Sequence, residues 1–150
     1  MGAGEIRLAC TDPHAQPELH YRFLQEAWDL ERMRYGVRLV IQLAESDALK
    51  EVIVERLAPT DADLVSDEAL DQWLLTHIST AHHLAGTCKM GPASDMMAVV
   101  DQYGRVHGLQ GLRVVDTSIM PDVVRANTNA TAMMMAERIA DWMKSERKEP

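Results

Sequence analysis

The stretch His82-His83-Leu84-Ala85-Gly86-Thr87-Cys88-Lys89-Met90-Gly91 places two adjacent imidazoles immediately before a loop bounded by glycines. Two further stretches follow it, Leu112-Arg113-Val114-Val115-Asp116-Thr117-Ser118-Ile119-Met120-Pro121 and Asn127-Thr128-Asn129-Ala130-Thr131. Taken singly, each has an ordinary structural interpretation, because turns and helix caps outnumber active sites. These ordinary roles are a plain loop for residues 86–91, a helix or turn cap for Asp116 and a helix cap for Asn127.

The residues upstream of these stretches predict one short strand and two helical segments. Apolar alternation predicts a strand at residues 5–9, which ends at the turn Thr11-Asp12-Pro13. From about Pro17, apolar residues at helical spacing predict a long helix that Gly36 interrupts, and a second segment then leads to a loop at residues 59–62. The apolar positions are Leu19, Phe23, Ala27, Leu30 and Met33 in the first segment and Val40, Leu43, Leu49 and Val52 in the second.

The residues around the three stretches predict two more helices and a region of short β-like pieces. Ser66 is expected to cap a helix that runs to about His77, since its hydroxyl can accept a bond from a first-turn N–H. Residues 79–120 contain Val99-Val100, a turn at residues 102–105 and an apolar strand at residues 112–115. The last helix, from about Asn129 to Lys144, is apolar almost all round, so we expect its first three turns to be buried.

Composition excludes several classes of partner. The chain has 150 residues, 15 of them basic and 23 acidic, and no basic cluster that would neutralise phosphates. We therefore expect no nucleic acid or anionic membrane as partner. Cys10 and Cys88 form no CxxC pair, which fits a reducing cytoplasm, and no run of about 18 apolar residues predicts a membrane span.

Together and in this order, the three stretches resemble the carboxyl-terminal signature of glucose-methanol-choline oxidoreductases, in their choline dehydrogenase-like form. That signature is a histidine shortly before Gly-Thr-Cys-x-Met-Gly, then His-Gly-x-x-x-Leu-Arg-Val-x-Asp-x-Ser-x-x-Pro, then Asn-x-Asn or Asn-x-His opening the last helix. Here the middle run extends from His107-Gly108 to Pro121. The resemblance continues, less specifically, through residues 4–13 and the helix after them. It implies FAD-dependent oxidation of an alcohol CH–OH group to a carbonyl.

The resemblance also implies roles for individual residues. It makes His83, three residues before Gly86-Thr87, the catalytic base, and it makes Asn129 the partner of that base. An imidazole can take the hydroxyl proton of a small alcohol substrate and an amide can orient the oxygen, while the hydride goes to N5 of the flavin. The residues implied to contact FAD are His82, Asp116, Thr117, Asn127 and Thr128.

The fold that the resemblance implies is α+β. Residues 1–80 are expected to form part of a substrate-binding domain, with a fragment of an antiparallel sheet and long helices. Residues 81–150 are expected to contain the signature region, with the catalytic loop, the last strand of the FAD domain and the terminal helix. The amino end of that helix, at residues 127–130, is expected to point at the flavin pyrimidine, where the helix dipole favours negative charge.

The family's main nucleotide-binding unit is not found in the sequence. Gly2-Ala3-Gly4 is followed by Arg7 where a Gly-x-Gly-x-x-Gly turn needs its third glycine, and residues 86–91 continue as Pro92-Ala93, not as the Lys and Ser or Thr of a P-loop. We therefore expect the chain to be inactive alone and to need the amino-terminal FAD-binding half that it lacks. Three explanations stay open: a split enzyme whose other chain supplies that half, a gene fragment or truncated chain, and a remnant reused as a non-catalytic interaction module.

Two neighbouring histidines also raise the possibility of a metal site together with His77 and Cys88. We expect no metal, because adjacent residues rarely bind the same ion and no ligand spacing is present. Cys88 and the methionines at 133–135 are interpreted as core residues.

Overall fold

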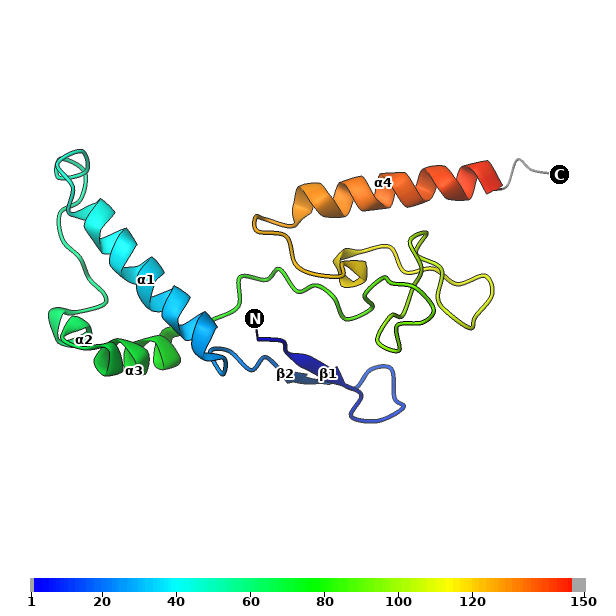
Figure 1. The fold of residues 1–150 in the computed structure, drawn as a ribbon, viewed down its shortest axis with the longest axis horizontal. Coiled ribbons are helices and arrows are strands. Elements are labelled where there is room, and N and C mark those ends of the chain that lie inside the picture. Colours follow the sequence, from blue (N-terminus) through cyan, green and yellow to red (C-terminus); the bar gives the residue numbers. More distant parts are fainter. Residues whose placement is uncertain (1, 147–150) are drawn as a thin grey trace. The chain divides into compact units, whose positions relative to one another are not determined.

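The computed structural model describes residues 2–146, which divide into two compact units between Ser79 and Thr80 (Figure 1). The domain boundary predicted from the sequence lies between residues 80 and 81, next to this division. The assignment of the units to a substrate-binding and a flavin-binding domain stays a prediction. The content of helices with one small sheet agrees with the α+β class.

The first unit begins with a two-stranded antiparallel sheet. Strand β1 (Glu5–Arg7) pairs with β2 (Glu18–His20), and Ile6 lies opposite Leu19. The predicted helix from Pro17 was therefore wrong over its first residues. Leu19 belongs to a strand pair, and Arg22 and Leu24 have φ values of 52° and 55°, a left-handed conformation that a right-handed helix cannot contain.

Helix α1 (Ala27–Ala44) passes through Gly36 without interruption, so the predicted break was also wrong. A glycine inside a helix costs about 1 kcal/mol, which contacts elsewhere along a helix can offset. Val40 and Leu43, predicted as part of a second segment, lie in α1, whereas Leu49 and Val52 lie in the turns that follow it.

Two short helices complete the first unit. Helix α2 (Asp61–Leu64) begins with a capping box between Thr60 and Asp63. Helix α3 (Asp67–His77) begins as predicted, because the Ser66 hydroxyl accepts the Ala69 N–H at 3.1 Å. Leu70 and Leu74 are the buried residues of α3.

Ion pairs join α1 to α3. The Arg34 guanidinium donates two hydrogen bonds to the Asp71 carboxylate, each of 2.6 Å, and Arg38 donates to Asp67 at 2.5 Å. The hydrogen bond from Arg38 lowers the pKa of the Asp67 carboxyl below its usual range. These pairs fix the helices side by side, since α1 itself has no buried residue among those described.

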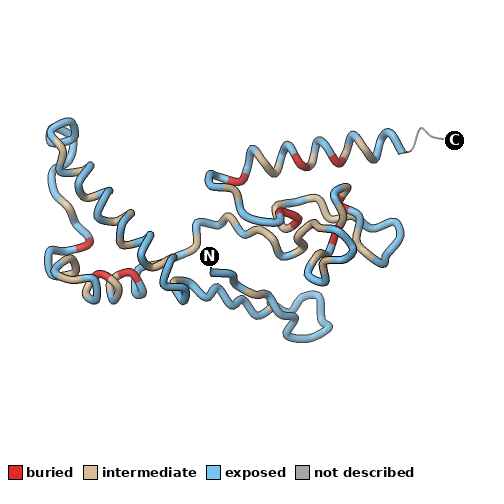
Figure 2. Tube along the Cα trace, viewed as in Figure 1, coloured by how far each residue is buried: buried red, intermediate tan, exposed pale blue. Residues whose placement is uncertain are grey.

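The second unit has its own core, formed by residues from its loops, from the 3-10 turn η1 (Thr117–Ile119) and from α4 (Asn129–Glu146). Figure 2 shows the buried residues of this unit in red, on α4 and on the segments beside it. The core residues are Val100, Ile119, Met120, Met135 and Ile139.

The strand predicted at residues 112–115 was wrong. In the described part of the chain, this segment makes one isolated bridge, between Arg113 and Arg105. The Val114 N–H donates to the Gly104 carbonyl within the same turn. A strand needs a hydrogen-bonded partner along its whole length, whereas here the pairing stays within the turn that joins Gly104 and Arg105 to Arg113 and Val114.

The terminal helix agrees with its prediction in position and differs in burial. Met135 and Ile139 are buried against the core, whereas Met133 and Met134 are 57% and 58% exposed. The expectation that the first turns and the whole methionine run are buried was therefore wrong for these two residues. The unit's loops cover only one side of the helix.

Candidate catalytic site

The loop after His83 is held in place by η1. The Thr117 hydroxyl donates to the Leu84 carbonyl at 2.8 Å, and the Met90 N–H donates to the Ile119 carbonyl at 2.8 Å. The same two segments share two more backbone hydrogen bonds. The Gly86 N–H donates to the Thr117 carbonyl, and the Cys88 N–H donates to the Ser118 carbonyl. We refer to these four bonds as the loop ladder.

Asp116 stabilises the turn that carries the ladder. Its carboxylate accepts the Ser118 N–H at 2.7 Å and so caps η1. Asp116 and Thr117, both predicted to contact FAD, thus use their side chains to fix the loop beside His83. Their contact with a cofactor stays a prediction.

The chain reaches His83 through a turn with left-handed geometry. His82 has a φ of 60°, and its N–H donates to the Thr80 hydroxyl at 3.0 Å. Non-glycine residues rarely adopt this conformation, and such residues are concentrated at functional sites. The His82 side chain itself is exposed.

Both ring nitrogens of His83 have polar neighbours from the segment before α4. Nδ1 lies 2.9 Å from the Thr128 hydroxyl, and Nε2 lies 3.3 Å from the Asn127 side-chain nitrogen. Thr128 is buried, with 5% of its surface exposed, whereas Asn127 is exposed and His83 is half-buried. Residues 44 and 45 positions apart in the chain therefore form one hydrogen-bonded cluster.

Asn129, the predicted partner of His83, begins α4 and is exposed. The hydrogen bonds described for the imidazole come from Asn127 and Thr128, so the partner role of Asn129 stays a prediction. Sequence reasoning assigned Asn127 and Thr128 to the cofactor and missed their contact with His83. The available signal was three consecutive polar residues, Asn127 to Asn129, where a helix begins.

The amino end of α4 suits one edge of a flavin. The first backbone bond of the helix runs from the Ala132 N–H to the Thr128 carbonyl at 2.8 Å, so the N–H groups of residues 129–131 have no carbonyl four residues earlier in the helix. Such an end attracts negative charge, which the pyrimidine edge of a reduced flavin carries. The residues present therefore fit part of FAD.

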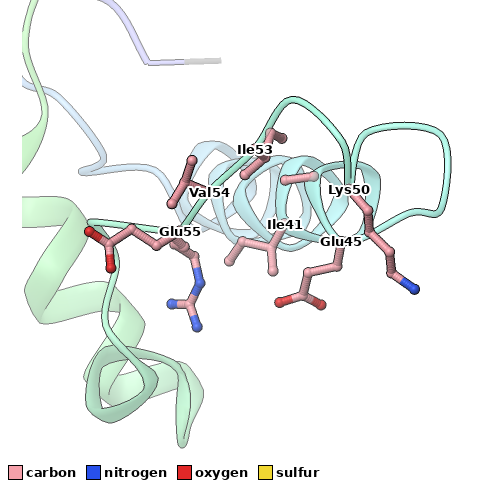
Figure 3. A pocket seen from close by; sticks show the side chains of 8 residues that line it. Ile41, Glu45, Lys50, Ile53, Val54 and Glu55 are labelled. Carbon is pink, nitrogen blue, oxygen red and sulfur yellow. The ribbon is translucent and has the colours of Figure 1, made fainter.

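Two pockets lie elsewhere, one in each unit. The first has a volume of about 450 Å³ and is shown in Figure 3, where Ile41 comes from α1 and Glu45, Ile53 and Val54 come from the segment after it. The second, of about 560 Å³, includes Tyr103 and His107 in its lining. His83 does not line either of these two pockets.

Within residues 2–146, no three His, Cys, Asp or Glu side chains are grouped so as to hold a metal ion. In the same part of the chain, no helix combines the length and hydropathy needed to cross a bilayer.

Comparison with known proteins gives one family. A sequence model described as GMC oxidoreductase matches residues 2–136. The chain is 44% identical over 138 residues to an oxygen-dependent choline dehydrogenase of Cronobacter sakazakii. The matched region covers 92% of this chain and 24% of that protein. The chain spans about a quarter of the length of the curated relatives it matches.

Solved structures give the same result. An FAD-dependent oxidoreductase from Chaetomium thermophilum matches with a TM-score of 0.88 at 30% identity, over 97% of this chain and 25% of that one. A formate oxidase from Aspergillus oryzae matches with a TM-score of 0.86 at 31% identity, over 97% of this chain and 25% of that one.

Proposed function

Because this chain belongs to the GMC oxidoreductase family, we propose that it is the carboxyl-terminal portion of an FAD-dependent enzyme that oxidises an alcohol CH–OH group to a carbonyl. The observation that carries the proposal is the cluster of His83, Asn127 and Thr128 at the amino end of α4. The similarity to a choline dehydrogenase supports a small alcohol as the substrate class.

In this proposal His83 is the catalytic base. Its imidazole accepts the hydroxyl proton as the C–H bond of the alcohol breaks, and the loop ladder keeps the ring in place. Asn129, at the start of α4, orients the substrate oxygen with an amide that does not titrate. FAD, when bound, supplies the hydride acceptor.

We propose that the remaining predicted site residues face the cofactor. The amino end of α4, with Asn127 and Thr128, lies toward the flavin pyrimidine, and Asp116 and Thr117 lie near the ribityl-pyrophosphate part. His82 lies beside the flavin. The exposure of His82, Asp116 and Asn127 supports this placement, because their side chains are accessible to a cofactor.

The proposal includes a second polypeptide segment that supplies the FAD-binding half, either as a separate chain or as the rest of a longer one. The chain corresponds to only a quarter of its relatives, and the exposed methionines of α4 offer apolar surface for such a partner. Two free cysteines support a cytoplasmic location.

The first experiment is an absorption spectrum, from about 300 to 550 nm, of the chain purified alone and after co-expression with the gene immediately upstream, since bound flavin absorbs there. Flavin bands only in the co-expressed sample are the expected result. A colourless chain in both samples, monomeric and unchanged by mixing with a Gly-x-Gly-x-x-Gly protein, would instead favour a remnant or a non-catalytic interaction module.

The role of His83 is tested in the assembled enzyme. His83→Ala should lower turnover by about two to four orders of magnitude, the usual contribution of a general base. His14→Ala, which removes an exposed imidazole from a loop of the first unit, is the control and should leave turnover unchanged. A loss of less than about tenfold in the His83 variant with flavin still bound would exclude His83 as the base.

A further inference from the structure

The two neighbours of His83 differ in what they can do chemically. The side-chain nitrogen of Asn127 carries only donor hydrogens, so at 3.3 Å from Nε2 it donates to a lone pair on that atom. A neutral imidazole with an acceptor Nε2 carries its proton on Nδ1. The Nδ1–H then donates to the Thr128 hydroxyl oxygen at 2.9 Å.

Thr128 occupies the capping position of α4, where a threonine hydroxyl usually bonds to a first-turn backbone N–H of its own helix. Its carbonyl accepts the Ala132 N–H, which places Thr128 directly before the first turn of α4. Here the hydrogen bond described for the hydroxyl is to His83, and no buried side-chain polar atom in the described residues lacks a partner.

We infer that Thr128 is a positioning residue that holds His83 in the Nδ1–H tautomer and thereby makes Nε2 the atom that accepts the alcohol proton. This inference rests on the proposed function. The Asn-x-Asn pattern does not specify the middle position, which is Thr128 in this chain. The buried position of Thr128 keeps water from competing for the Nδ1–H.

The proton transfer balances with these partners. The alcohol hydroxyl takes the place of the exposed Asn127 amide at Nε2 and donates its hydrogen bond there. The O–H bond breaks with its electron pair left on the alcohol oxygen, an Nε2–H bond forms from the imidazole lone pair, and the ring becomes an imidazolium. The Nδ1–H remains bonded to Thr128 throughout, so the new positive charge has a hydrogen-bond acceptor on its buried side.

The tautomer is measured directly by nitrogen NMR of the 150-residue chain labelled with ¹⁵N-histidine. The inference predicts a protonated Nδ1 and an unprotonated Nε2 for His83 at a pH where the ring is neutral. A protonated Nε2 in the unmodified chain would overturn the inference without any variant.

Two matched variants separate the hydroxyl from the shape of the side chain. Thr128→Val keeps the branched shape and removes the hydroxyl, and it should shift the tautomer ratio toward Nε2–H by about fivefold to tenfold, the loss of one hydrogen bond. Thr128→Ser keeps the hydroxyl and should retain the original ratio. An unchanged ratio in Thr128→Val, with the Ile139 methyl signals still those of the folded unit, would overturn the inference.

Activity of the assembled enzyme gives the second readout. Thr128→Val should lower kcat by about tenfold, and Thr128→Ser should restore it to within about threefold. If His83→Ala lowers turnover as expected while Thr128→Val leaves it unchanged, Thr128 does not position the base. If His83→Ala has little effect, the proposed function fails, whereas the NMR result for Thr128 is unaffected.

Discussion

At the scale of single residues, the setting of His83 depends on which of three neighbouring polar side chains faces the ring. The motif indicates the histidine and the Asn127-Thr128-Asn129 triplet, and the structure brings both to one place. The motif does not indicate which member of the triplet bonds to which ring nitrogen. That choice depends on the backbone angles by which the chain enters α4, and sequence spacing carries no information on them.

Replacing Asn129 by Asp tests the placement of the amino end of α4. The new carboxylate would lie where the reduced flavin carries negative charge, so the Asn129→Asp enzyme should reduce its flavin more slowly, by about tenfold or more. Stopped-flow absorbance of flavin reduction measures this rate. Asn129→Gln, which keeps the amide, is the control, and equal rates in the Asp variant and the unmodified enzyme would contradict the placement.

Gly104 is required for two separable reasons. Its φ is 74°, and a Cβ added to it would lie 2.7 Å from the Val114 carbonyl oxygen, a backbone atom that cannot turn away. Gly111 has almost the same φ, 75°, and open space around it. Gly111→Ala should thus show only the cost of the left-handed conformation, about 1 to 2 kcal/mol, and Gly104→Ala a larger one. Urea unfolding of both variants measures the difference, and equal costs would show that the clash at Gly104 relaxes.

At the scale of elements, local signals were sufficient where one element stabilises itself. The Ser66 cap and the start of α4 were predicted correctly because each depends on residues within a few positions. β2 was missed because a strand is defined by its partner, and the apolar residues of 19–33 also fit a helical period. The continuation of α1 through Gly36 depends on the length of the helix and on its ion pairs to α3, which no local window contains.

The packing of α4 predicts a contrast between its two faces. Ile139 is 2% exposed in the core of the second unit, and Met134 is 58% exposed. Ile139→Ala should lower the free energy of unfolding by about 2 to 5 kcal/mol, and Met134→Ala by less than about 0.5 kcal/mol in the chain alone. Denaturant unfolding followed by circular dichroism checks both values. Similar losses in the two variants would mean that the helix packs through a different face.

The ion pairs between α1 and α3 predict a loss of stability in acid. The hydrogen bond from Arg38 lowers the pKa of Asp67 in the folded state below the ordinary value of 3.8, so the folded form binds fewer protons than the unfolded form. The resulting stabilisation is present above that ordinary value and is lost as the pH falls through the lower, folded pKa. Urea midpoints measured between pH 7 and pH 2 should fall less in Asp67→Asn than in the unmodified chain.

Asp67→Asn leaves other lowered carboxyl pKa values in place, such as that of Asp63 beside Thr60. The variant should therefore flatten the acid limb of the stability curve without abolishing it. An acid limb identical to that of the unmodified chain would show that the Arg38 pair does not contribute.

At the scale of the whole chain, each unit exposes large apolar side chains, and the curated relatives, of whose length the chain spans about a quarter, have more polypeptide. In the first unit these include Trp28 and Tyr35 on α1, 57% and 69% exposed, and in the second Met133 and Met134 on α4. Such surfaces are unusual for a protein that works alone. Which faces of α1 and α4 stay exposed was not predictable from their periodicity, because burial depends on the tertiary packing that each helix finds and not on the local sequence alone.

Under the proposed function, the exposed surface predicts a response to an FAD-binding portion. The chain alone should strongly enhance the fluorescence of a hydrophobic dye, and mixing or co-expression with the FAD-binding portion should reverse most of that enhancement, since the apolar side chains become covered. Light scattering of the same samples tests for self-association. Undiminished dye binding in a complex that carries flavin would show that these faces remain free in the enzyme.

The loop ladder has a consequence for how such enzymes can be recombined. All four of its bonds, and both hydrogen bonds of the His83 ring, join residues of the second unit. A crossover between two genes of the family at the codons for Ser79 and Thr80 would therefore transfer the histidine, its loop and its helix as one intact cassette. Chimaeras joined at this point would inherit the hydrogen-bonded His83 cluster from one parent and the whole first unit from the other.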